Sequence, residues 1–105
     1  MYKEIFIDNI NRIKNLSNEP TLAIICTPKN IVKKTLIKEL LNIGTTWFYF
    51  WNKYAKESEN FTDEIIESLD KLEIVTISNL INDIEIIKDD VKNLQLNIRH
   101  IFIND

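Results

Sequence analysis

Few side chains in this chain could do covalent chemistry. Cys26 and His100 are its single cysteine and its single histidine, which excludes a metal site built from a cluster of these two residue types. A Cys–His nucleophile pair requires the thiol and the imidazole to meet at hydrogen-bond distance. Cys26 follows four apolar residues and no acid is placed to orient His100, so the sequence predicts a buried, inert thiol and a packed or edge-strand histidine. The Asp and Glu residues show no distinctive pair spacing. We therefore predict that the protein is not an enzyme.

A phosphate-binding pattern is present in outline. The segment TLAIICTPKNIVKKTLIKELL, residues 21–41, predicts a strand, a turn and then Lys34-Thr35 at the start of a helix. This order resembles the phosphate-binding loop of P-loop ATPases. In that motif two glycines let backbone N–H groups surround the phosphates, but Pro28 and Lys33 stand at the two positions here. The loss of both glycines removes the means of holding the phosphates.

The later segment EIVTISNL resembles the metal-binding strand of the same family, with Ser78 and Asn79 where acids are expected. No magnesium site and no nucleotide cofactor are therefore predicted. The resemblance leaves open a degenerate, non-hydrolysing regulator that binds a nucleotide or phosphate near Lys29, Lys33 and Lys34. A further alternative is an enzyme with a site at the carboxyl ends of the strands. Its candidate residues are Thr27, Asn30, Asn52, Ser78 and Asn104.

Charge is distributed very unevenly along the chain. Residues 57–90 contain eleven acids and two lysines, whereas residues 1–56 contain nine basic residues and four acids. The total of −3 therefore hides a polarised molecule. If the two helices of the acidic segment lie side by side on one face of a sheet, their acids form a continuous wall that attracts a basic partner and repels nucleic acid. The alternative is a merely solvated face. The acids that we assign to partner binding are Glu64, Glu67, Asp70, Asp83, Asp89 and Asp90.

Half of the aromatic residues stand in one segment, TTWFYFW, residues 45–51. In a strand, Trp47, Tyr49 and Trp51 point to one face while Phe48 and Phe50 point to the other. Only the first set carries N–H or O–H groups. One interpretation is a partly covered Trp-Tyr-Trp face that binds a protein partner. The other is a central strand with helices on both faces, in which all five aromatics belong to the core.

Hydrophobic periodicity predicts an alternation of helices and strands in a single domain, residues 1–105. The expected fold is an α/β three-layer sandwich with a four-stranded, mainly parallel sheet and about four helices. Thr62 and Ser78 are the expected caps of the third and fourth helices, and Gly44 ends the second. The expected helices are residues 2–16, 31–43, 63–72 and 79–94, and the expected strands are residues 21–26, 45–51, 73–77 and 97–103.

The amino-terminal sequence carries charged and polar residues throughout, which is not typical of a signal peptide. A single cysteine suits a reducing compartment, and we expect a cytoplasmic protein without a membrane segment. We expect a small acidic binding module with a basic protein partner and no cofactor. Its most concrete form is an immunity protein or antitoxin that neutralises a nuclease toxin by blocking its cationic cleft. The partner's identity, the strand order and the oligomeric state do not follow from the sequence.

Overall fold

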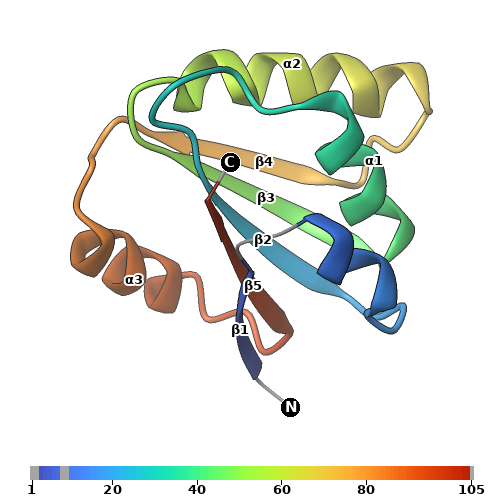
Figure 1. Cartoon of the computed structure of the whole chain (residues 1–105), viewed down its shortest axis with the longest axis horizontal. Helices are drawn as coiled ribbons and strands as arrows, with labels where there is room; N and C mark the ends of the chain where they lie inside the picture. Colours follow the sequence, from blue (N-terminus) through green and yellow to red (C-terminus); the bar gives the residue numbers. More distant parts are fainter. Residues whose placement is uncertain (1–2, 8–9, 105) are drawn as a thin grey trace.

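Five parallel strands form one sheet in the computed structural model, which describes residues 3–7 and 10–104 (Figure 1). The spatial order of the strands is β1-β5-β2-β3-β4. This order leaves β1 and β4 at the two edges and places β3, the aromatic strand, inside the sheet. The strands are β1 (Lys3–Ile7), β2 (Thr21–Cys26), β3 (Thr45–Trp51), β4 (Val75–Asn79) and β5 (Arg99–Asn104).

The helices lie on both faces of the sheet. The 3-10 helix η1 (Ile10–Asn15), α1 (Lys34–Asn42) and α2 (Ala55–Ser68) cover one face, and α3 (Ile84–Asn93) covers the other (Figure 1). The chain steps in one direction from β2 to β3 to β4 and then returns across two strands to β5. Because right-handed crossovers taken in opposite directions lie on opposite faces, the return places α3 opposite α1 and α2. The predicted α/β class is confirmed, while the strand and helix numbers differ in detail.

The predicted helix over residues 2–16 is wrong. Lys3–Ile7 forms β1, which pairs in parallel with β5, and only Ile10–Asn15 is helical, as a 3-10 helix. Residues 2, 8 and 9 of the predicted helix lie outside the described residues. Phe6, Ile13 and Leu16 have helical spacing by coincidence, since KEIFI pairs with a strand more than ninety residues later in the chain. A long-range partner of this kind is invisible to local periodicity.

The third and fourth helices begin elsewhere than predicted. α2 starts at Ala55, eight residues before the expected start at residue 63, so Thr62 lies inside the helix and is no cap. Ala55, Ser58 and Thr62 are fully buried, because this helix packs on the sheet through small side chains that resemble a polar loop in sequence. α3 starts at Ile84, with Asp83 accepting a hydrogen bond from the Glu85 backbone N–H at 3.0 Å. The predicted cap Ser78 belongs to β4.

The helix α1 ends where the glycine predicts. Gly44 has a φ of +96°, and its N–H donates to the carbonyl of Leu41 at 3.2 Å. A Cβ at this position would lie 2.5 Å from the Glu19 carbonyl oxygen. A side chain at residue 44 would therefore be excluded both by backbone conformation and by space.

One buried cation closes the amino-terminal end of the sheet. The side chain of Arg99, at the start of β5, is 3% exposed. Its Nε donates to the hydroxyl of Thr21 at 2.9 Å and its Nη2 donates to the carbonyl of Ile43 at 3.0 Å. Its Nη1 lies 3.7 Å from the Glu19 carboxylate. These partners compensate the burial of the guanidinium charge. Arg99 thereby links β5 to β2 and to the end of α1.

Candidate functional site

The aromatic strand β3 is covered on both faces. Phe48 and Phe50 pack in the apolar layer beneath α1 and α2, and Tyr49 and Trp51 pack in the layer beneath α3. Tyr49 is fully buried and Trp51 is 8% exposed, while Trp47 is partly buried. The structure agrees with the second interpretation of the aromatic run, a central strand that is covered on both faces. Tyr49 and Trp51 therefore lie in the core, and Trp47, which is partly buried, is the most exposed of this set.

The predicted continuous wall of acids is not formed. It required α2 and α3 to lie side by side, but these helices lie on opposite faces of the sheet (Figure 1). The physical reason is the return of the chain from β4 to β5 against the direction of the earlier crossovers. All six acids of the prediction are nevertheless exposed: Glu64, Glu67, Asp70, Asp83, Asp89 and Asp90.

The strand order brings the acidic segment together in another way. Residues 57–90 comprise most of α2, then β4, and then the first turns of α3. β4 is the last strand of the sheet and has α2 on one of its faces, while α3 lies on the opposite face of the sheet, where Asp90 is linked to β4 through Tyr49 and Asn79. We define the β4 edge as β4 with the acids that flank it: Glu59, Asp63 and Glu67 from α2, Asp83 from the segment between β4 and α3, and Asp90 from α3.

On the α2 face, acids bind directly to the edge strand. The Ser78 hydroxyl donates to Glu59 at 2.7 Å, and the Thr76 hydroxyl lies within hydrogen-bond distance of both Glu59 and Asp63. Lys56 forms an ion pair with Glu59 at 3.1 Å. Glu67 follows Asp63 by four residues, so it continues the same row along the helix. A row of carboxylates therefore runs beside one face of β4.

On the α3 face, a three-residue chain of hydrogen bonds joins the helix to the sheet. Asp90 accepts a hydrogen bond from the Tyr49 hydroxyl, which in turn accepts one from the Asn79 side chain at 3.2 Å. Burial, followed by the hydrogen bond to Asp90, raises the pKa of Tyr49 to about 12. Asp90 is itself exposed, so its carboxylate both anchors the buried phenol and presents charge beside β4.

Apolar side chains gather at the same edge. Val75, in β4, is 37% exposed, and Ile86 shares a side of α3 with Asp90 at a spacing of four residues. Leu72 and Leu80 are 72% and 68% exposed in the segments before and after β4. Exposed apolar side chains mark an interaction surface where they form a contiguous patch. The full set in or next to residues 69–86 is Leu69, Leu72, Val75, Leu80, Ile81 and Ile86.

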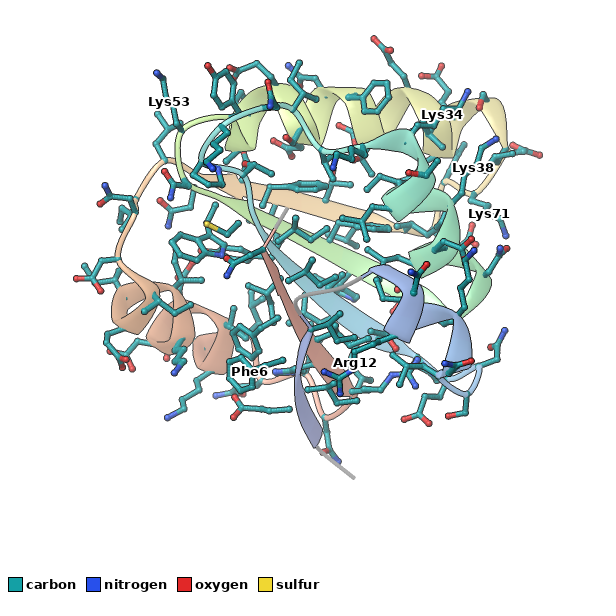
Figure 2. The ribbon with its side chains drawn as sticks, in the orientation of Figure 1. Phe6, Arg12, Lys34, Lys38, Lys53 and Lys71 are labelled. Atoms are coloured by element: carbon teal, nitrogen blue, oxygen red, sulfur yellow. The ribbon has the colours of Figure 1, made fainter. Side chains whose placement is uncertain are left out.

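At the opposite side, near β1, a cavity of about 480 Å³ opens at the carboxyl ends of the strands. Its walls are largely apolar and include Phe6, Phe102, Trp51 and Ile84, with Arg12 also among its lining residues. Phe6 and Phe102 stack with ring centroids 4.8 Å apart. Figure 2 shows Phe6 and Arg12 together at this side of the molecule. The cavity has a location typical of ligand sites in α/β sheets, and among the described residues that line it Arg12 and Asn104 are the polar ones.

The turn that resembles a phosphate loop is occupied by internal contacts. The backbone N–H of Val32, which would face a phosphate in such a loop, donates to the Ser58 hydroxyl at 2.9 Å. The N–H of Thr27 donates to the carbonyl of Trp51 at 2.9 Å. Helix α1 begins at Lys34, and no side chain caps its first turn. Two of the N–H groups of the β2–α1 segment are thus used within the protein.

The candidate catalytic residues are not brought together. Thr27 is buried with its hydroxyl within 3.2 Å of the Trp51 carbonyl, and Ser78 is held by Glu59 on the α2 face. Asn52 adopts a φ of 84° and its amide lies 3.5 Å from the sulfur of Cys26. Asn30 and Asn104 are exposed. No nucleophile and base of this set meet.

Cys26 and His100 lie at opposite ends of neighbouring strands. Cys26 pairs with Asn104 and His100 pairs with Leu22, so the two residues are about 13 Å apart at roughly 3.3 Å per residue. Burial raises the pKa of the Cys26 thiol and lowers the pKa of His100, whose Nε2 lies 3.1 Å from the Leu96 carbonyl. Both residues have the environment of core groups.

Comparison of the chain with protein-family models, with curated proteins and with solved structures finds no match. Within residues 3–7 and 10–104, no group of three or more His, Cys, Asp or Glu side chains is arranged to hold a metal ion. The described helices also include none with the length and apolarity needed to cross a membrane.

Sequence reasoning missed two acids of the β4 edge, Glu59 and Asp63. Their signal was present, because their spacing of four residues places them on one side of a helix. It was missed because the expected third helix began at residue 63, whereas α2 begins at Ala55.

Proposed function

We propose that the protein is a binding module that captures a basic protein partner through the β4 edge. The observation that carries this proposal is the placement of acids from α2 and α3 on both faces of one exposed strand. Acids beside exposed apolar side chains, such as Val75 in β4, suit an interface in which electrostatic attraction accelerates encounter and apolar contacts slow dissociation.

The most concrete form of this function is the inhibition of a nuclease toxin, as an immunity protein or antitoxin does. A nuclease needs a cationic cleft to bind RNA or DNA, and an acidic domain that fills this cleft excludes the substrate. The acidic side of this protein is also unsuited to bind nucleic acid itself, because its carboxylates repel phosphates. The proposed inhibitor therefore needs no catalytic residues and no cofactor.

Affinity capture from extracts of the native organism tests the proposal. The wild-type protein is immobilised beside a four-Lys variant, and retained proteins are identified by mass spectrometry. The variant changes Glu67 and Asp83 of the β4 edge, together with Glu64 and Asp89, which adjoin Asp63 and Asp90 in sequence. We expect a basic protein on the wild type that is lost from the variant. Retention of the same proteins by both would refute binding at the β4 edge.

The inhibitor role needs a second measurement on the captured partner. Its nuclease activity on RNA and DNA is assayed with increasing amounts of wild-type protein, and with the four-Lys variant as the matched control. We expect stoichiometric inhibition by the wild type only. A partner with no nuclease activity, or one that stays active in the complex, would exclude the inhibitor role while leaving the binding function in place.

A further inference from the structure

We propose that β4 binds an extended basic segment of the partner as an added sixth strand of the sheet. This inference rests on the proposed function, since it names how the partner binds at the same edge. In strand addition, main-chain hydrogen bonds supply affinity and alternating side chains supply specificity.

The first step of the argument is that β4 is open to pairing. It lies at the end of the sheet, its described hydrogen-bonded neighbour is β3, and none of its five residues is buried. Its sequence, VTISN, contains no charge and no proline. Natural proteins block free edges with lysine, proline, bulges or covering loops, because an open edge is a template for another strand. β4 carries neither of the first two.

The second step is the chemistry of the two faces that an added strand would continue. On one face, Thr76 and Ser78 stand beside Glu59 and Asp63. On the other, Val75 and Ile77 belong to the side that packs toward α3, next to Trp47. Because side chains alternate along a strand, the complementary segment alternates Lys or Arg with aliphatic residues. The neighbouring strand would lie about 4.8 Å from β4, within reach of the Glu59 and Asp63 carboxylates for a long basic side chain.

The third step decides between a foreign strand and a second copy of this chain. Pairing of two β4 edges would bring the carboxylates of α2 and α3 of each copy against those of the other. Like charges opposed across an interface disfavour association, whereas a basic segment is attracted by both rows of acids. The charges that flank β4 thus leave the strand open to a basic partner and oppose self-pairing.

The experiment uses the full chain and two peptides of identical composition. The probe is a fluorescein-labelled heptapeptide that alternates Lys and Val, and the control peptide groups the same residues as Lys-Lys-Val-Val-Val-Lys-Lys. We expect the alternating peptide to bind at least about tenfold more tightly, because only it places lysines on one face of a strand. Amide hydrogen exchange should then slow at residues 75–79 and not in β1.

A pair of variants tests the edge itself. Val75→Lys puts a charge on the open strand and should weaken binding of the alternating peptide about tenfold, as a lysine does on protected natural edges. Ile31→Lys is the matched control, since Ile31 is also exposed, at 44%, but lies in the loop after β2. It should leave binding unchanged, and the melting temperature of both variants shows whether they are folded.

Several results would overturn strand addition. Equal binding of the two peptides, exchange protection outside β4, or a self-associated dimer that Val75→Lys disrupts would each do so. If the captured basic protein binds the wild type and Val75→Lys equally well, strand addition is wrong and the proposed function stands. If the peptide binds at β4 but no acid-dependent partner exists, the proposed function is wrong and the edge chemistry stands.

Discussion

The two edge strands of the sheet, β1 and β4, differ in where charged side chains lie relative to the strand. β1, KEIFI, carries the charged residue Glu4 within the strand, and Lys88 of α3 lies 5.6 Å from the ring of its exposed Phe6. β4, VTISN, has no charge within the strand but has carboxylates beside it on both faces. A charged residue within an edge strand disfavours pairing with another strand. Acids beside the strand instead favour basic segments and disfavour acidic ones. By this comparison β1 carries the protection that edge strands usually have, and β4 is the edge at which we propose that a basic segment binds.

Truncation of a buried side chain inside the sheet should lower the free energy of unfolding far more than truncation of a side chain at the β4 edge. Phe48→Ala and Phe50→Ala should each cost about 3–5 kcal/mol of unfolding free energy, because both side chains are fully buried. Trp51→Ala should cost a similar amount, whereas Val75→Ala at the edge should cost about 1 kcal/mol or less. Denaturant melts of the single variants measure these differences. A β4 edge as sensitive as β3 would mean that Val75 belongs to the core.

Charge reversal in the acidic segment should slow association with the partner, whereas charge reversal in the basic part of the chain should not. With Glu64, Glu67, Asp83 and Asp89 changed to Lys, association with the captured partner should slow at least about tenfold at low salt. The matched control changes Lys29, Lys33, Lys38 and Lys53, of the basic part of the chain, to Glu and should not slow association. Figure 2 shows Lys38 and Lys53 on the surface. An association rate that both variants leave unchanged would contradict charge steering.

The Tyr49 hydroxyl links the sheet to Asp90 of α3. Its deprotonation should lower the free energy of unfolding at alkaline pH. Its pKa is raised to about 12 in the folded protein from 10.0. The folded state therefore holds this proton more tightly, so its contribution to stability is complete below pH 10 and is lost as the pH rises toward 12. Tyr49→Phe should cost about 1 kcal/mol at neutral pH and show a weaker decline in the alkaline range. Equal pH dependence in both proteins would assign the decline to other groups.

The smallest expected effect is that of ATP on the melting temperature. Because Pro28 and Lys33 replace the two glycines and Ser58 occupies the Val32 N–H, millimolar ATP with magnesium should leave the melting temperature unchanged. Inorganic phosphate serves as the control for non-specific ionic effects. A saturable rise in melting temperature with ATP alone would move the functional site from the β4 edge to the β2–α1 turn.

Sequence by itself determined the elements whose signals are local. The strands TLAIIC and TTWFYFW, the class of fold and the end of α1 at Gly44 were predicted because apolar runs and a left-handed cap depend on near neighbours. The acidic segment was likewise visible as composition. The six acids that the sequence assigned to partner binding are exposed, as charged side chains are unless they are paired.

Tertiary structure decided the rest. KEIFI is a strand because β5 pairs with it, and Ala55–Ser68 is one helix because small side chains face the sheet, and neither partner is near in sequence. Strand order had the largest consequence for the site. It covered Tyr49 and Trp51 on a central strand, separated α2 from α3, and placed their acids on the two sides of β4. No local pattern encodes the direction in which a chain returns across a sheet, because that direction is selected by the packing of the whole domain.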